Sequence, residues 1–507
     1  MSRVNNLVHN AKWLYLGTLL DVAMGLASRT VFSYILGTTF LGLNSFFVSI
    51  IGVLSVTELG IGTVLNTQLY KPVAHGDYEK VKSILALYRK TYYVVAIVIM
   101  IAGLTILPFV RGMIKSTEYI AEIEVYFLLF LVNSSITYFV SYKFSIPNAE
   151  QKMYIQTNIN SVFSVCTIAA SILIVLVWKS YFLYLSAILF INVIKIIVSN
   201  NILNKRYPIF RDRQIQKLSV EDKRELIRNI RAGTAYRLSD IAIGTSTNII
   251  LSGKVGIDTT GRFSNYSMFV LYIERFTKPL VESTGPGIGE FINTQSTESK
   301  MTLLKTYQFV GFWIYGFCSI GLACLSTPLI QLWLGADKII AQTAVVLYCF
   351  NFLCSGLSRS YGAIQSAHGV FYYDWYVGIV AAGLNIAVSL LFVKPFGLAG
   401  VFLGSTCATL TVALWSPAIT YKRFFAGSPA GYFLDFGRYL LVGLSTGAVC
   451  YMISSVILAQ VTLSNFFFAL LLVIIVPNVI WIMLFHRTDE FRYVKRIIST
   501  ILERRKR

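Results

Sequence analysis

Long uninterrupted runs of apolar residues recur along the whole chain, and short polar segments separate them. Val94 to Val110, Ser161 to Trp178 and Phe466 to Phe485 are uncharged, and each reaches or approaches the length that crosses the hydrocarbon core of a bilayer. The pattern predicts an all-α integral membrane protein with about fourteen transmembrane helices. The predicted helices cover residues 12–36, 39–63, 88–109, 121–142, 155–178, 181–201, 236–254, 262–284, 306–328, 340–358, 373–394, 398–420, 437–458 and 464–486.

Composition supports the membrane interpretation. Of the 507 residues, 55% are hydrophobic and only 13% are charged, whereas soluble proteins average about 25% charged residues. A water-soluble core cannot bury that much apolar side chain. Lys12 leads into a long helix without a small-residue cleavage site, so we expect the first helix to be retained rather than removed as a signal peptide.

The net charge of +20 is explained by topology. Lysine and arginine gather in alternate connections, and such connections lie on the cytoplasmic side of a membrane. The even number of predicted helices then places both termini in the cytoplasm. The basic connections also predict contact with anionic membrane lipids, and they leave no reason to expect nucleic-acid binding. The positive connections hold Lys71 to Lys90, Lys143 and Lys152, Lys205 to Arg231, Lys300 and Lys305, Lys422 and Arg423, and the tail from Arg487 to Arg507.

Cysteine and histidine give no sign of metal or redox chemistry. All seven cysteines fall inside apolar runs, and the four histidines are scattered without acidic or cysteine neighbours at ligand spacing. We therefore expect packing cysteines, no disulfide, no metal site and no cofactor.

An internal repeat predicts two related halves. Asp21 to Gly25 recurs as Asp240 to Gly244, and Gly37 and Gly42 match Gly256 and Gly261 in the same register. About six helices separate the copies, and an even number predicts parallel repeats related by an axis along the membrane normal. Later in each copy, Gly60, Gly62 and Asn66-Thr67-Gln68 recur as Gly287, Gly289 and Asn293-Thr294-Gln295.

The predicted organisation follows from the repeat. We expect a six-helix bundle over residues 1–203, a linker over 204–235, a second six-helix bundle over 236–424, two additional helices over 425–486 and a basic cytoplasmic tail over 487–507. The linker contains a capping-box-like Ser219 to Asp222, followed by Leu226, Ile227 and Ile230 at helical spacing. It is either an amphipathic helix on the inner membrane surface or a solvated helix without a partner.

The glycine-containing segments resemble those of the bacterial polysaccharide flippases. The residues that carry the likeness are Leu36-Gly37 with Leu41 to Leu43, Glu58 to Gly62, the connection from Asn66 to Lys90, and Gly397 to Gly404. These flippases share a superfamily with the multidrug and toxin extrusion transporters and the lipid II flippases. The resemblance spans essentially the whole chain, although none of its motifs is a catalytic signature.

The resemblance implies two six-helix bundles around a central cavity, two extra helices at the C-terminus, and alternating access. It implies location in the bacterial plasma membrane and, as substrate, an oligosaccharide linked through pyrophosphate to a polyprenyl chain. The expected protein partners of such a flippase are a polysaccharide polymerase or other polysaccharide assembly proteins.

Ionisable residues inside predicted spanning helices are candidate functional residues, because each costs several kcal/mol unless it meets water or a partner. The basic candidates for binding pyrophosphate are Arg29, Lys195, Arg262, Arg275 and Lys278. The alternative for helix 262–284 is structural ion pairing at i,i+4 spacing, between Glu274 and Lys278 or between Lys278 and Glu282. Lys195 and Arg262 also lie close enough to helix ends to extend toward the interface.

Three carboxylates are candidates for coupling transport to a proton or sodium gradient. They are Asp21, Asp240 and Glu58, and the two aspartates occupy matched positions of the repeat. A purely structural pairing of the aspartates is equally compatible with the sequence. Gly60, Gly62, Gly287 and Gly289 are predicted to permit close packing or hinge motion at the cytoplasmic ends of their helices.

Two other functions compete with flipping. A membrane polymerase or ligase would need a large external segment for its acceptor, and every predicted external connection is short. A multidrug extrusion antiporter of the same fold would use the acidic residues, although several embedded cations disfavour cationic drugs.

Overall fold

The computed structural model describes residues 3–58, 61–116, 119–210, 244–282, 297–368, 375–424 and 428–506. Within these ranges the protein is all-α, with sixteen α-helices joined by short turns. Ten of the described helices are long and apolar enough to cross a membrane. The protein is therefore a multi-pass membrane protein, as the apolar runs predict.

Packing divides the chain into two compact units, residues 1–261 and 262–507. The helices of the first unit are α1 (Arg3–Ile35), α2 (Gly37–Leu54), α3 (Ile61–His75), α4 (Tyr78–Ile106), α5 (Ile123–Ser141), α6 (Ser145–Ala149), α7 (Tyr154–Trp178) and α8 (Tyr181–Arg206). A 3₁₀ turn, Ser55–Glu58, interrupts the chain between α2 and α3. A π-helical turn, Leu251–Val255, precedes α10 (Ile257–Glu282), whose first residues belong to this unit.

Side-chain caps mark where several helices begin. The Asp77 side chain accepts from the Lys80 backbone N–H at the start of α4, and Ser180 caps α8 in the same way through Leu183. Such caps satisfy backbone donors that have no partner within the helix. Polar residues between apolar runs thus mark the starts of these helices.

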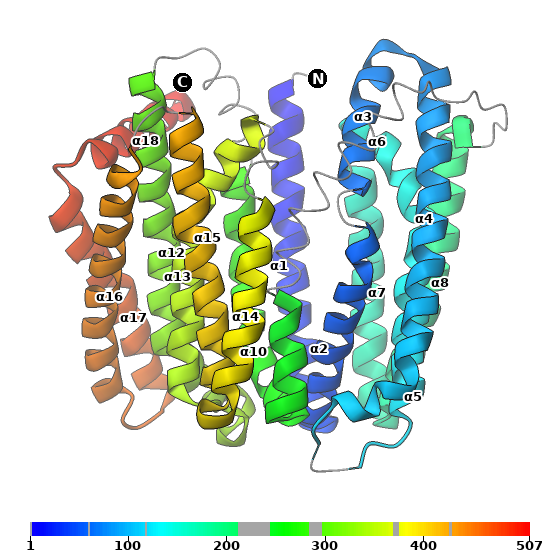
Figure 1. The fold of residues 1–507 in the computed structure, drawn as a ribbon, viewed down its shortest axis with the longest axis horizontal. Helices are drawn as coiled ribbons and strands as arrows, with labels where there is room; N and C mark the ends of the chain where they lie inside the picture. Colours follow the sequence, from blue (N-terminus) through cyan, green and yellow to red (C-terminus); the bar gives the residue numbers. More distant parts are fainter. Residues whose placement is uncertain are drawn as a thin grey trace. The chain divides into compact units, whose positions relative to one another are not determined.

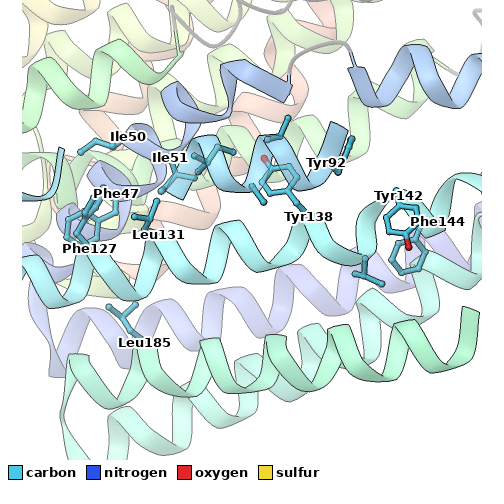
Figure 2. Close-up of a cluster of buried hydrophobic side chains, with 14 of the residues drawn as sticks. Phe47, Ile50, Ile51, Tyr92, Phe127, Leu131, Tyr138, Tyr142, Phe144 and Leu185 are labelled. Atoms are coloured by element: carbon cyan, nitrogen blue, oxygen red, sulfur yellow. The ribbon is translucent and has the colours of Figure 1, made fainter. Parts of the chain in front are cut away.

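The core of the first unit is a layer of aromatic and aliphatic side chains between α2, α4, α5 and α8. Phe47, Phe127 and Leu131 have no exposed surface, and Leu185 closes the layer from α8. Figure 2 shows this cluster, with Tyr92 and Tyr138 lying within it. α5 contacts both α4 and α8, and α7 lies along α1 and α8 (Figure 1).

The matched glycines of the sequence repeat meet where α2 and the start of α10 cross. A Cβ atom added to Gly42 would overlap the backbone of Ile257, and one added to Gly261 would overlap the backbone of Thr38. The Thr38 hydroxyl also donates to the Asp258 carboxylate. Only glycine permits so close an approach of two helix backbones.

The second unit contains α12 (Thr297–Leu334), α13 (Gln342–His368), α14 (Trp375–Phe396), α15 (Leu398–Phe424), α16 (Ala430–Ile457), α17 (Leu463–Phe485) and α18 (Asp489–Lys506), together with α10 from Arg262 onward. Its core centres on Trp481 and Phe312, which have no exposed surface. Phe312 stacks on Tyr439 with ring centroids 4.9 Å apart. The basic tail forms α18, and Phe491 of this helix packs against Trp313.

The helical class and the membrane character are confirmed, whereas the count of fourteen and the repeat arrangement stay predictions. α10 is helical over most of its predicted range but does not qualify as an apolar span, because it carries six charged residues. The linker from residue 211 to 235 and residues 236–243 of the predicted helix 236–254 lie outside the described residues. The predicted division at the linker likewise stays a prediction.

Candidate functional site

A polar pocket of about 430 Å³ opens among α1, α7 and α8 of the first unit. Ten of its twelve lining residues carry polar side chains or are glycine. The lining consists of Gly17, Thr18 and Asp21 from α1, Thr157, Asn160, Ser161, Phe163, Ser164, Thr167 and Ile168 from α7, and Asn192 and Lys195 from α8. Such a concentration of polar groups is unusual among apolar spanning helices.

Two ionisable side chains of opposite charge face this pocket. Asp21 accepts a hydrogen bond from the Ser164 hydroxyl at 3.1 Å. Lys195 lies half-buried near the middle of α8, and the described residues include no ion pair between it and Asp21 within 4 Å. The structure thus brings together one candidate cation and one candidate coupling carboxylate, although the sequence placed Lys195 near a helix end.

The polar network continues beyond the pocket into α5. The side-chain amide of Asn192, which lines the pocket, donates a hydrogen bond to the side-chain oxygen of Asn133 at 2.8 Å. This bond orients the Asn192 amide. Polar groups buried among helices cost free energy unless they are hydrogen-bonded to protein, water or ligand. The remaining amide, hydroxyl and ammonium groups of the lining therefore favour a solvated or ligand-filled pocket.

Arg29 lies two turns along α1 from Asp21, outside the pocket lining. It is half-buried, and it lies close enough to Tyr184 of α8 for an electrostatic interaction. Tyr184 in turn packs edge-on against Phe32, with ring centroids 5.0 Å apart. Arg29 thus lies near Tyr184, outside the pocket that Asp21 lines.

Glu58 occupies a second polar centre, at the break between α2 and α3. The hydroxyl of Tyr92 donates to its Oε1 atom at 2.8 Å, and the hydroxyl of Tyr138 donates to Oε2 at 2.7 Å. Tyr88 extends the cluster, with its hydroxyl 3.3 Å from that of Tyr92 and 3.4 Å from the Gly62 carbonyl. All three tyrosines are buried, so the carboxylate is held by neutral donors from α4 and α5.

In the second unit, Glu274 of α10 forms an ion pair with Arg359 of α13. The side chains are 18% and 24% exposed, respectively, so the pair is largely removed from solvent. The guanidinium also lies 5.3 Å from the centroid of the buried Tyr315 ring. Glu274 thus pairs with a residue of another helix. The predicted i,i+4 pairing with Lys278 stays a prediction, because the Lys278 side chain lies outside the described residues.

Two further cations lie along α10. Arg275 is exposed, and its guanidinium lies 5.6 Å from the centroid of the Tyr272 ring. Arg262 lies near Asp337 in the turn between α12 and α13. Lys338, through a hydrogen bond, and more weakly Arg262 hold the pKa of the Asp337 carboxyl below its ordinary value.

Several predicted residues fall outside the described structure. They are Asp240, Gly60, Gly287 and Gly289, together with the side chain of Lys278. The residues that sequence reasoning missed are Arg359, Tyr92 and Tyr138. Arg359 follows directly after the predicted helix 340–358, and the i,i+4 spacing of Tyr88 and Tyr92 was the available signal for the tyrosines.

Comparison with known proteins identifies the family. The family described as polysaccharide biosynthesis protein matches residues 7–291, which is more than half of the chain. The comparison with curated protein sequences found no match.

Solved structures identify the fold. The lipid II flippase MurJ in an inward closed conformation superposes with a TM-score of 0.62 at 13% identity, over 93% of this chain and 98% of that chain. An inward-facing multidrug resistance MATE family transporter of the MOP superfamily gives a TM-score of 0.60 at 14% identity, over 80% and 95% of the two chains. A MOP superfamily transporter from Pyrococcus furiosus gives 0.54 at 14% identity, over 83% and 96%. The chain therefore belongs to the polysaccharide biosynthesis protein family and has the fold of the MOP superfamily transporters.

Proposed function

We propose that this protein is a flippase for lipid-linked oligosaccharides. It moves an oligosaccharide attached through pyrophosphate to a polyprenyl chain from the inner to the outer leaflet of the bacterial plasma membrane, by alternating access. The product serves capsule, exopolysaccharide or O-antigen synthesis. The observation that carries the proposal is a polysaccharide biosynthesis family match in a chain with the fold of membrane transporters.

The polar pocket supports a carbohydrate substrate. A volume of about 430 Å³ lies within the range of roughly 300–1,000 Å³ that small-molecule sites occupy. Its amides and hydroxyls both donate and accept hydrogen bonds, which suits sugar hydroxyl groups. Asp21 supplies a charged acceptor, and Lys195 supplies a cation for an acidic group.

The remaining embedded charges take the roles that their positions in the predicted spanning helices suggest. Arg29, Arg262, Arg275 and Lys278 supply positive charge for the pyrophosphate, and guanidinium groups match phosphate oxygens in two-point hydrogen bonding. Asp21, Asp240 and Glu58 couple the cycle to a proton or sodium gradient. Polymerase and assembly proteins would take up the exported unit.

A polymerase or ligase fits the described structure less well. The described connections on the predicted outer side are short, and the longest runs from Leu107 to Glu122. Multidrug extrusion is the second candidate, since the fold is shared with a multidrug resistance transporter. The three basic residues of α10, Arg262, Arg275 and Lys278, disfavour cationic drugs as the main substrate, although the same helix carries three acidic residues.

The location of the lipid-linked unit in cells that lack this protein tests the proposal. We expect surface polymer to be lost and lipid-linked repeat units to accumulate on the cytoplasmic leaflet, because synthesis continues while transfer stops. The measurement is accessibility of the units to an impermeant sugar-oxidising reagent in intact and in permeabilised cells. Units that react in intact cells would instead indicate a missing polymerase or ligase.

A further inference from the structure

The cluster around Glu58 is a separate centre from the polar pocket, because none of its residues lines that pocket. Among the described residues, no cation lies within ion-pair distance of the Glu58 carboxylate. Its two described donors are phenol hydroxyls, at 2.7 and 2.8 Å. A carboxylate held only by neutral donors can gain or lose a proton without breaking an ion pair.

Among the side chains that the structure describes, the neighbouring elements place no charged group in the cluster. α2 contains no ionisable residue over its whole length. The ionisable groups that face Glu58 are Tyr88 and Tyr92 from α4 and Tyr138 from α5. Arg89, the next residue of α4, engages Tyr142 instead. On α3, Lys71 and His75 lie in the last turns, far from the break.

The hydrogen bonds form a chain whose direction depends on the protonation of Glu58. With Glu58 ionised, Tyr92 must donate to the carboxylate, and its oxygen is free to accept from Tyr88. With Glu58 protonated and donating to Tyr92, the Tyr92 hydrogen turns to Tyr88, and the Tyr88 hydrogen turns to the Gly62 carbonyl. One proton enters from water and binds a carboxylate oxygen, while the phenol hydrogens only rotate and no other O–H bond breaks.

The Gly62 carbonyl is the last acceptor in this series of hydrogen bonds. Gly62 is the second residue of α3, and a Cβ atom there would overlap the Tyr92 hydroxyl and lie 3.2 Å from that of Tyr88. Only glycine lets both hydroxyls approach this turn. Protonation of Glu58 therefore changes a hydrogen bond to the backbone of α3, beyond the break in the helix.

We propose that Glu58, Tyr92, Tyr88 and the Gly62 carbonyl form a proton-binding site that transmits protonation from the break at Ser55–Glu58 to the start of α3. Tyr138 holds the second carboxylate oxygen and can turn to Ser55, whose hydroxyl lies 3.4 Å away. This inference rests on the proposed function, for which it names the proton as the coupling ion and α3 as the element that responds.

Infrared difference spectroscopy of the purified protein in lipid nanodiscs tests proton binding without any substrate. We expect wild type to show a protonated-carboxyl C=O band that disappears as the pH rises, and Glu58→Gln to lose that band. Glu79→Gln is the matched control, because Glu79 is an exposed carboxyl on α4 that pairs with Lys82. An unchanged band in folded Glu58→Gln protein would overturn the proposal.

Hydrogen–deuterium exchange tests the transmission to α3. After correction for the intrinsic pH dependence of amide exchange, we expect the protection of peptides covering 61–75 to differ between low and high pH in wild type and in Tyr93→Phe, and this difference to be lost in Tyr92→Phe. Tyr93 lies next to Tyr92 on α4 but packs against Phe139 outside the cluster. A pH response of α3 that survives Tyr92→Phe would overturn the transmission. Neither measurement requires substrate or transport. If proton binding is observed but the protein does not flip lipid-linked oligosaccharide, the result counts against the proposed function and not against the proton-binding site.

Discussion

Replacement of Arg359 by alanine is expected to destabilise the second unit by about 3 kcal/mol, or on the order of 5–10 °C in Tm. The substitution removes the Arg359 guanidinium from the Glu274 carboxylate, which is only 18% exposed. Removing one partner of a buried pair costs more than the pair itself contributes, because the remaining charge stays desolvated. The lost guanidinium contact with Tyr315 adds to the effect.

Thermal unfolding of purified protein in detergent measures this change. Arg275→Ala is the matched control, since Arg275 is an exposed cation on the same helix as Glu274 and should change Tm by no more than a degree or two. The double variant Arg359→Met with Glu274→Gln should recover most of the loss, because it removes both charges together. An Arg359→Ala protein as stable as Arg275→Ala would mean that the ion pair is not formed.

Gly261→Ala is expected to cost about 3 kcal/mol by forcing apart two helix backbones that lie in direct contact. The added Cβ would overlap the Thr38 carbonyl oxygen and lie 2.7 Å from its carbon and 3.0 Å from the Gly42 backbone nitrogen. Backbone atoms cannot rotate away as a flexible side chain would. The hydrogen bond between Thr38 and Asp258 should be lost with the separation.

A helical glycine with open space provides the comparison. Gly383 lies in α14, and an added Cβ there would meet nothing within 4 Å, so Gly383→Ala should be neutral or stabilising by up to about 1 kcal/mol. Tm and the yield of monodisperse protein report both variants. Equal stability of Gly261→Ala and Gly383→Ala would contradict the close crossing of α2 and α10.

Apolar periodicity was sufficient to predict most of the helices, because a bilayer-crossing segment must be long and apolar whatever its neighbours are. It ended the helix around Cys349 at residue 358, whereas α13 continues to His368. Ser358 and Arg359 lower the local hydropathy, so the apolar run ends there although the helix continues. The ion pair that satisfies Arg359 comes from Glu274, 85 positions earlier in the chain.

The contacts between side chains of different helices were harder to predict than the positions of the helices along the chain. Sequence spacing relates residues within one helix, and it offered Lys278 as a partner for Glu274, a pairing that the described residues do not test. It also gave Lys195 as a candidate cavity cation without indicating its neighbour, and the structure places Lys195 in a pocket with Asp21, from helices more than a hundred residues apart. The tyrosines around Glu58 likewise come from two other helices. Which helix faces which is a property of packing, and no local pattern records it.

Translocation by the purified protein tests the central claim most directly. The measurement places a fluorescent polyprenyl-pyrophosphate oligosaccharide in proteoliposomes and follows the fraction that an impermeant quencher cannot reach, with Lys195→Ala and the exposed Lys179→Ala as variant and control. The account predicts protein-dependent exchange between leaflets in wild type and Lys179→Ala, and a loss of at least about tenfold in rate in Lys195→Ala. Exchange no faster than in protein-free vesicles, with correctly folded wild-type protein, would contradict it.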